Sequence, residues 1–285
     1  MKENLRVIFI IGGILLLAGA LYMYIQPSKT YSSDLIVLKT WELPDSLREI
    51  SGISYLGDSK MACIQDEDGI IFIYDLNLGQ VVNEIEFGLR GDYESIRVID
   101  STAFIMESKG SVYKVSNFES DRRQIEKFTT EFNSSNDMES LDFHPITNSF
   151  LTIPKEKNLS KQCKAFSIYK MNAKNFKIAE DCFLTLTNKQ AFFKTHRPKF
   201  KASDFHASEL SVHPHTSEIF ILSSKPPQLL VISKEGLPKE FHLLNPKQFQ
   251  QPEGLSFDSK GRMYISNEEG NSNRQNIQLV EYKGV

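Results

Sequence analysis

The sequence predicts an all-β protein: a five-bladed β-propeller of four-stranded antiparallel blades, preceded by one N-terminal transmembrane helix. Three observations predict this architecture. A short motif recurs five times after residue 33, which is typical of a repeat protein. Short strands rich in β-branched and aromatic residues follow each copy, and helical periodicity is absent beyond residue 30. A long uncharged apolar run lies near the N-terminus.

Residues 1–26 are predicted to be a membrane anchor or an uncleaved signal. Lys2 and Arg6 precede an apolar run over Val7–Ile25 that contains no charge. Such a run is long enough to cross a bilayer as a helix, and the flanking positive charges favour a cytoplasmic N-terminus. We therefore expect a single-pass protein of the bacterial inner membrane with its propeller on the periplasmic side. The alternative is a signal peptide cleaved near Ala18–Ala20, which would release the protein as a secreted form.

Residues 27–33 are expected to form a linker, because Pro, Ser, Lys and Thr bury little surface. The propeller is expected over residues 34–285. Hydrophobic residues make up 40% of the chain and charged residues 24%, as in globular proteins with a real core. The formal net charge of −3 excludes a general polyanion-binding role, so no nucleic-acid partner is expected.

Each copy of the motif has seven positions. In order, they hold a polar residue; any residue; Glu or Ser; a small or polar residue; Ile or Leu; a polar residue; and an aromatic residue or Val. The copies span residues 49–55, 92–98, 137–143, 206–212 and 251–257. Their third positions lie 43, 45, 69 and 45 residues apart. A four-stranded blade needs roughly 40–50 residues, so each copy starts one blade and the third blade carries about 25 extra residues.

Second and third strands follow each copy of the motif. The second strands are expected at 61–64, 103–106, 150–153, 219–222 and 263–265, and the third at 70–74, 111–115, 165–169, 229–232 and 277–282. The last repeat leaves little chain for a fourth strand. Leu35–Leu38 is therefore predicted to complete the fifth blade, which closes the ring and removes its exposed edges.

The first strand of each blade lines the central channel. Because side chains alternate along a strand, motif positions one and three are predicted to face one channel mouth. These positions hold His206, Gln251, Ser51 and Ser208 together with the six carboxylates of Glu49, Asp92, Glu94, Asp137, Glu139 and Glu253. The second strands end on the same face, so Asp66, Glu107, Asn267 and Glu268 are candidates for additional ligands.

Crowded carboxylates raise one another's pKa unless a proton, a basic group or a cation relieves them. An all-oxygen set suits Ca²⁺, which takes six to eight oxygen ligands in loose geometry. The sequence therefore predicts a calcium site at the mouth. The structural alternative is that these carboxylates only bond backbone amides of neighbouring blades.

The extra residues of the third blade fall at 155–164 and 188–205, and both segments are expected to overhang the mouth. The second contains Phe192, Phe193, His196 and Arg197. Aromatic and basic residues together suggest an anionic or sugar-like ligand, or lipid headgroups. The favoured alternative is a solvated lid whose Lys and Arg side chains balance the acidic ring.

Several motifs resemble the SdiA-regulated family, which is distantly related to NHL-repeat propellers. They are Ser51-Gly52-Ile53, Gly91-Asp92-Tyr93-Glu94, and Gln251–Leu255 followed by Tyr264–Glu268. The resemblance covers residues 34–282 and implies a five-bladed propeller with a calcium site, but it supplies no biochemical activity. Glu209 departs from the pattern, because related repeats mostly carry a small residue there.

Two functions fit the sequence. The favoured one is a calcium-stabilised, non-catalytic module that binds an unknown envelope ligand or protein partner. The alternative is a metal-dependent hydrolase of the lactonase or phosphoesterase type, with His206 as the general base. The chain contains no G-x-S-x-G, H-E-x-x-H, P-loop or C-x-x-C motif, which favours the binding module.

Cys163 and Cys182 flank a predicted turn at 172–175 at nearly equal distances. Residues equidistant from a hairpin turn face each other at distances that a disulfide tolerates, so a bond between them is a candidate. A one-residue change of register would instead leave two unpaired thiols. Cys63, in a second strand, is expected to be a small buried hydrophobe.

Overall fold

The computed structural model describes residues 11–17, 31–160, 163, 166–179, 181–187, 189–196, 201, 205–270 and 273–284. The chain divides into two compact units, Met1–Tyr31 and Ser32–Val285. Residues 11–17 are helical, and the rest of the predicted membrane span over Val7–Ile25 lies outside the described residues. Within the described part of the chain, no helix is both long and apolar enough to cross a membrane.

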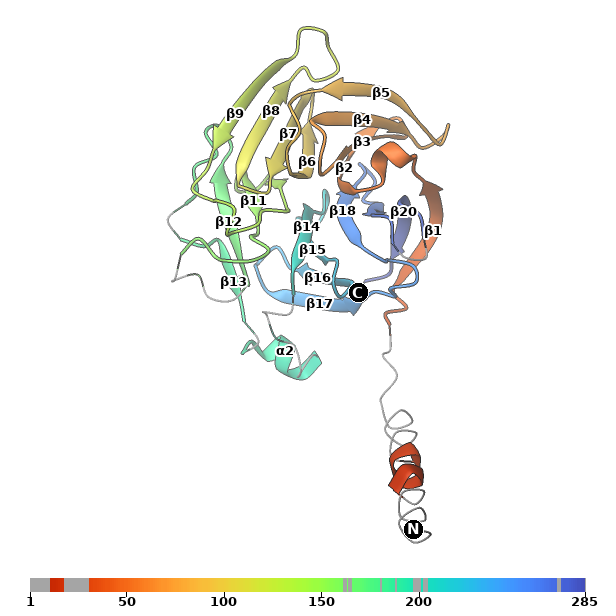
Figure 1. The fold of residues 1–285 in the computed structure, drawn as a ribbon. Helices are drawn as coiled ribbons and strands as arrows, with labels where there is room; N and C mark the ends of the chain where they lie inside the picture. The colour runs from red at the N-terminus through yellow and green to blue at the C-terminus, as the bar shows by residue number, and fades with distance from the viewer. Residues whose placement is uncertain are drawn as a thin grey trace, which may run out of the picture. The chain divides into compact units, whose positions relative to one another are not determined.

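In the second unit, the described residues form five four-stranded antiparallel sheets arranged as a ring (Figure 1). Blade 1 contains β2 (Ile50–Gly57), β3 (Lys60–Gln65), β4 (Ile70–Asp75) and β5 (Gln80–Glu86); blade 2 contains β6 (Tyr93–Ile99), β7 (Thr102–Glu107), β8 (Ser111–Ser116) and β9 (Gln124–Thr129). Blade 3 contains β10 (Asp142–His144), β11 (Ser149–Thr152), β12 (Phe166–Asn172) and β13 (Leu184–Leu186); blade 4 contains β14 (Ala207–Val212), β15 (Ile219–Ser223), β16 (Gln228–Ile232) and β17 (Pro238–Leu243). Blade 5 contains β18 (Pro252–Phe257), β19 (Met263–Asn267), β20 (Asn276–Tyr282) and β1 (Leu35–Glu42).

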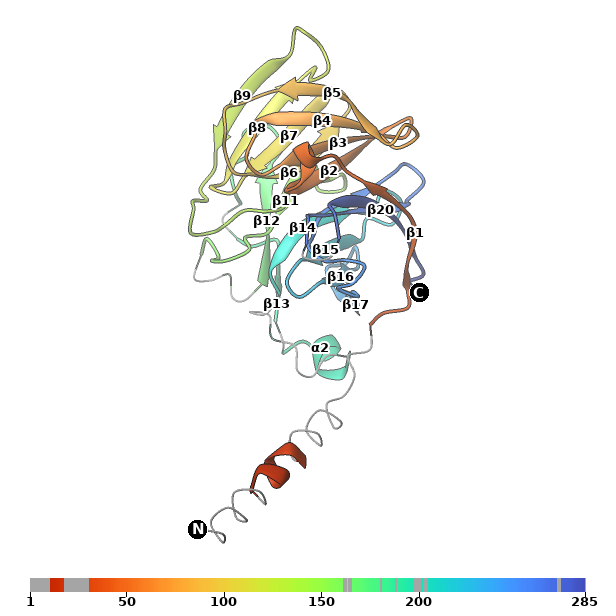
Figure 2. The same ribbon diagram turned by 45° about the vertical axis from the view of Figure 1, so that its right-hand side comes forward.

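The closure predicted for the fifth blade is confirmed. Strand β1 pairs antiparallel with β20 from Leu35 opposite Tyr282 to Glu42 opposite Asn276, with one register shift between Val37 and Lys39. Figure 2 shows β1 running along β20 on the outside of the blade. The outer strand is longer than the Leu35–Leu38 segment predicted, because the bulge lets the ladder continue through its polar half. A short 3-10 helix, Asp45–Leu47, then leads into β2.

The hydrophobic core is divided into clusters that lie between adjacent blades. Ile64 and Ile73 of blade 1 pack with Ile96 and Ile105 of blade 2, and the other neighbouring pairs of blades are joined in the same way. Each blade buries both faces, and this explains why their inner strands are continuous hydrophobic runs. Removal of such apolar surface from water is the main stabilising contribution to the ring.

A one-residue β-bulge recurs at motif position three. The register shifts between Ile50 and Gly52 in blade 1, and at the equivalent places in blades 2, 4 and 5. In blade 3, one extra residue also separates the Met138–Pro154 bridge from the Asp142–Leu151 pair. A bulge bends the strand and re-aims its side chains. The strict alternation from which positions one and three were predicted to converge is therefore interrupted.

Motif position four packs against the next blade. A Cβ atom added to Gly52 would lie 2.9 Å from the Ile96 backbone nitrogen, and one added to Gly254 would lie 3.0 Å from that of Ile53. Real Cβ atoms almost never approach backbone so closely, so glycine permits the neighbouring first strands to meet. Glu209 holds the same motif position in blade 4 and is completely buried.

Candidate functional site: the acidic mouth of the channel

Six carboxylates meet at one end of the propeller, and we call them the acidic mouth. They are Asp92, Glu94, Asp137, Glu139, Glu253 and Glu268. Backbone hydrogen bonds connect the segments that carry them. Ser108 N donates to Asp92 O, Met138 N to Ser108 O, and Lys155 N to Asp137 O, each at 2.9 Å. These backbone hydrogen bonds join the parts of the mouth that blades 2 and 3 supply.

Among the described residues, Lys155 is the one whose ammonium lies against Glu139. Its Nζ forms an ion pair with Glu139 Oε1, and its side chain is 27% exposed. Burial lowers the pKa of Lys155, but the carboxylates of Glu139, Glu253 and Asp137 outweigh burial and raise that pKa above its usual value. Lys155 therefore remains charged and partly neutralises the mouth.

The carboxylates of the mouth hold protons tightly. Burial, followed by the charges of Glu139 and Asp92, raises the pKa of Glu94 well above its usual range. Burial, followed by Glu139 and Glu268, does the same for Glu253. Burial is the largest cause of both shifts.

Two further members of the mouth titrate near neutrality. Burial raises the pKa of Glu139 to about 7 although Lys155 opposes the shift. Burial and then the charge of Asp66 raise the pKa of Glu268 to about 7. Carboxyl groups at close range cannot all ionise, because their negative charges repel one another. An additional positive charge would therefore stabilise the ionised mouth.

Among the six carboxylates of the acidic mouth, one buried oxygen lacks a donor. Glu139 is 6% exposed, and within the described part of the chain its Oε2 has no hydrogen-bond partner. Buried polar atoms are satisfied in the great majority of native structures. Glu139 Oε2 therefore marks a place where a donor or a cation fits.

Of the other predicted residues, Glu49, Asp66 and Gln251 lie beside the mouth. Burial, then Glu49 and Glu67, raises the pKa of Asp66 to about 6. Gln251 Nε2 donates to Glu268 Oε2 at 2.7 Å. These contacts place three predicted residues around Glu268, which was expected only as an additional ligand.

Several predicted residues serve the fold instead. Ser51 Oγ donates to Tyr93 O at 2.6 Å and Ser208 Oγ to Pro252 O at 2.8 Å, so both join neighbouring blades. Glu107 accepts from Lys127 Nζ at 2.8 Å within blade 2.

Asn267 and His206 also have partners of their own. Asn267 Nδ2 donates to Asn276 Oδ1 at 3.0 Å, and both side chains lie in blade 5. His206 Nδ1 lies 3.7 Å from Glu156 Oε1. His206 therefore has an acidic neighbour, which the sequence did not identify.

Phe192 and Phe193 of the second insertion pack into the core and do not extend over the mouth. Helix α2 (Ala191–His196) contacts β17. Phe193 is 1% exposed within the cluster between blades 3 and 4, and Phe192 packs against that cluster. Arg197 lies outside the described residues. Phe192 and Phe193 therefore contact the hydrophobic core in place of the suggested ligand. Burial of an apolar ring in the core is lower in free energy than its exposure to water.

A charged ring at motif position six was not predicted. Arg97 Nε lies 2.7 Å from Asp142 Oδ1, and the Arg97 guanidinium also donates to Ser256 Oγ at 3.3 Å and Ser211 Oγ at 3.5 Å. Both charged side chains are at most 10% exposed. These residues occupy position six in four successive motifs, so stacking that position would have found them. Arg97 thus crosses the channel to three other blades.

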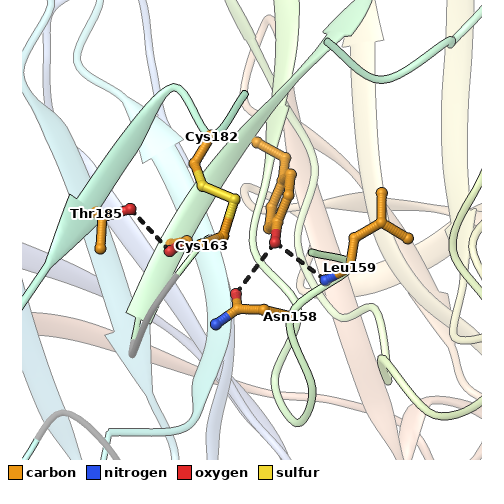
Figure 3. Close-up of a disulfide and its surroundings, with 7 residues drawn as sticks. Asn158, Leu159, Cys163, Cys182 and Thr185 are labelled. Atoms are coloured by element: carbon orange, nitrogen blue, oxygen red, sulfur yellow. Dashed lines mark hydrogen bonds between the residues drawn. A yellow bond between two sulfur atoms is a disulfide. The ribbon is translucent and has the colours of Figure 1, made fainter. Parts of the chain in front are cut away.

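Cys163 and Cys182 form a disulfide, with their Cα atoms 5.9 Å apart (Figure 3). They do not face each other in the hairpin ladder, where Phe166 pairs with Leu186. Cys163 precedes β12 and Cys182 precedes β13, so both cysteines lie outside the paired residues of this ladder. The same figure shows the Tyr169 hydroxyl bonded to Asn158 and to the Leu159 amide, on the segment that follows Lys155.

Cys63 is unpaired and buried. Burial raises the pKa of its thiol. It packs as a small apolar side chain in the cluster between blades 5 and 1, as the sequence predicted.

The calcium site expected from the sequence stays a prediction. Its all-oxygen chemistry suits a hard cation. Yet among the residues that the structure describes, no group of three or more His, Cys, Asp or Glu side chains is placed to hold a metal ion. The Lys155 ammonium instead occupies the position against Glu139.

The fold and the mouth together define the class: a five-bladed β-propeller with an acidic channel entrance. A model of the SdiA-regulated family matches residues 30–272. The chain therefore belongs to the SdiA-regulated family, as its motifs indicated. No curated protein sequence matches it.

Solved structures of other propellers share the fold. Glutaminyl cyclase from Myxococcus xanthus matches with a TM-score of 0.63 and 10% identity, over 88% of this chain and 97% of the cyclase. The PQQ-bound aldose sugar dehydrogenase from Streptomyces coelicolor matches with a TM-score of 0.58 and 10% identity, over 90% of this chain and 99% of the dehydrogenase. At this identity the similarity shows the fold alone, and function must come from the site.

Proposed function

We propose that the protein is a binding module that takes a cationic group of its ligand into the acidic mouth. The observation that supports this proposal is the crowding of six carboxylates around the Lys155 ammonium, where burial and neighbouring carboxylates raise the pKa of Glu94, Glu139 and Glu253. A raised carboxyl pKa means that the site has an unmet affinity for positive charge. Glu139 Oε2, which has no hydrogen-bond partner among the described residues, is the atom that a cationic group would contact.

The mouth binds a group that enters from one side. Arg97 crosses the channel and contacts Asp142, Ser211 and Ser256 of three other blades. A ligand that enters at the mouth therefore meets a charged barrier within the channel. This geometry favours recognition of a terminal cationic group over passage through the ring.

In this proposal, the module lies outside the cytoplasm, and its N-terminal segment holds it to the membrane. The charges of Lys2 and Arg6 and the uncharged run after them support this location. The Cys163–Cys182 disulfide supports it independently, because disulfides persist in oxidising compartments. The ligand would then be an envelope component or a protein partner that carries positive charge.

Thermal unfolding of the purified full chain tests this function. The chain is titrated with Ca²⁺, Mg²⁺, spermidine and a lysine-rich peptide, and the same series is run on Glu253→Gln and on Glu126→Gln. Glu126 pairs with Lys114 on the surface of blade 2 and serves as the matched control. A ligand present at a hundredfold its Kd stabilises the folded state by about 2.7 kcal/mol.

Organic cations should raise the Tm of the wild type and of Glu126→Gln, with a weaker response in Glu253→Gln. Identical responses in the two variants, or no response to any cation, would refute the proposal. A response to Ca²⁺ alone, reversed by EDTA, would favour the calcium site expected from the sequence over an organic ligand.

A further inference from the structure

We infer that the acidic mouth is a site for a primary ammonium on an unbranched alkyl chain, and that Lys155 fills this site from within the protein. The inference rests on the proposed function and names its ligand class: a lysine side chain or a terminal alkylamine of the ligand. Such a ligand binds by exchange with the Lys155 side chain. Lys155 is then both a structural counter-charge and a competitor that controls access to the mouth.

The backbone fixes Lys155 at the edge of the mouth. Lys155 N donates to Asp137 O at 2.9 Å, and Glu156 N donates to Asn136 O at 3.0 Å. Asn136 Nδ2 in turn donates to Lys157 O at 2.7 Å. The main chain at Lys155 is therefore attached to the segment that carries Asp137 and Glu139, and the side chain needs only its own length to reach Glu139.

The chain beyond Lys155 is also held. Leu159 N donates to the Tyr169 hydroxyl at 3.0 Å, and the disulfide of Cys163 with Cys182 follows four residues later. A segment attached at both ends does not swing away as a lid. The Lys155 side chain is 27% exposed, so rotation about its own bonds is sufficient to vacate the mouth.

Glu139 supplies the second observation. It is 6% exposed; its Oε1 accepts from Lys155, and its Oε2 has no donor among the described residues. An ammonium carries three N–H donors in a compact, rotatable group. Glu139 can therefore exchange one ammonium for another without losing a hydrogen bond, and its second oxygen can accept from the amine that replaces Lys155.

Chemical rescue of Lys155→Ala tests the inference. The substitution removes the ammonium and three methylene groups, and n-butylammonium supplies an ammonium on an unbranched alkyl chain at least that long. Butylammonium should raise the Tm of Lys155→Ala in a saturable manner, whereas butanol, which has no charge, and tetramethylammonium, which has no N–H donor, should not. The wild type should show an apparent affinity for butylammonium that is about tenfold or more weaker, because Lys155 competes.

Lys127→Ala is the matched control, because Lys127 forms an ion pair with Glu107 at 2.8 Å on the outer part of blade 2. Butylammonium should give Lys127→Ala no more stabilisation than the wild type receives. Equal stabilisation of Lys155→Ala and Lys127→Ala by butylammonium would overturn the inference.

Amine acetylation of the wild type provides a measurement that needs no folded Lys155 variant. Mass spectrometry should find Lys155 acetylated about tenfold or more slowly than Lys127, because the mouth keeps its amine protonated and enclosed. Spermidine should increase acetylation at Lys155 and leave that at Lys127 unchanged. Equal rates at the two lysines would overturn the inference.

These outcomes separate the inference from the proposed function. Rescue of Lys155→Ala with no binding of any external cation to the wild type would leave Lys155 as a permanent occupant and refute only the binding function. Binding to the wild type without rescue of Lys155→Ala would refute only the ammonium site.

Discussion

Replacement of Glu268 by Gln should stabilise the protein at alkaline pH and change little at acidic pH. In the folded state the pKa of Glu268 is raised from 4.5 to about 7, first by burial and then by Asp66. The native protein therefore binds this proton more tightly than the unfolded chain does. The resulting stability is fully present below about pH 4.5 and is lost as the pH rises through about 7. Gln251 Nε2 donates to Glu268 Oε2 at 2.7 Å, and the side-chain amide of the Glu268→Gln variant retains an acceptor oxygen for it.

The size of the effect follows from the shift in pKa. Each pKa unit corresponds to about 1.4 kcal/mol, so a shift from 4.5 to about 7 corresponds to a ceiling of about 3 kcal/mol. Burial lowers the pKa of His144 and of His213, and their titration changes stability in the opposite sense below about pH 6.5. That contribution is common to wild type and variant and cancels in their difference.

Urea unfolding at about pH 5, 6, 7 and 8 measures the effect. The Glu268→Gln variant should match the wild type at the lowest pH and gain about 3 kcal/mol at the highest. Glu269→Gln is the matched control, because Glu269 is the next residue, is 41% exposed and pairs with Arg48 at the surface. A Glu268→Gln curve parallel to that of the wild type would refute the electrostatic account of the mouth.

Three further results are expected. Mass spectrometry of the non-reduced protein should find Cys163 linked to Cys182, and Cys182→Ser should lower stability by about 3 kcal/mol on the chain-entropy model. Arg97→Met should lower the free energy of unfolding by about 3–5 kcal/mol, since it leaves Asp142 buried without its partner, whereas loss of the exposed Arg274, which pairs with the exposed Asp45, should lower it by at most about 1 kcal/mol in the same urea titration. The intact chain should sediment with membranes and resist carbonate extraction, and a soluble form lacking residues 1–20 would indicate signal cleavage instead.

The fold could be predicted because each blade repeats one local pattern. The five motifs and their spacing give the number of blades, and the short apolar strands after them give the sheets. The closing strand could be predicted by elimination, because the last repeat has too little chain beyond Tyr282 and Leu35 begins a spare strand. These are local signals, and every blade supplies them again.

The site could be predicted only in part, because it depends on contacts between blades. Period-two alternation does not survive the bulge at motif position three, so a flat strand was the wrong model for Ser51 and Ser208. Glu107 was assigned to the mouth by its place at a strand end, but its ion pair with Lys127 lies within blade 2. Lys155 was expected only as part of a balancing segment, since no sequence spacing relates it to Glu139.

The disulfide shows a pairing reached by different geometry from the one expected. Hairpin symmetry about residues 172–175 suggested that Cys163 faces Cys182. The ladder instead places Phe166 opposite Leu186, and the two cysteines bond outside its paired residues. Cα atoms 5.9 Å apart satisfy the requirement of a disulfide whichever route the backbone takes.

The residues that break the five-fold repeat carry the charges that balance the channel. Position six holds Ser in three motifs, but blades 2 and 3 substitute Arg97 and Asp142, which neutralise each other. The insertion that lengthens blade 3 delivers Lys155 to Glu139. A ring of identical blades would place like charges opposite one another and repel itself. Chemical specificity in this propeller therefore has to arise where its blades differ. Lys155 comes from the insertion of blade 3, and it lies where we propose that an external ligand binds.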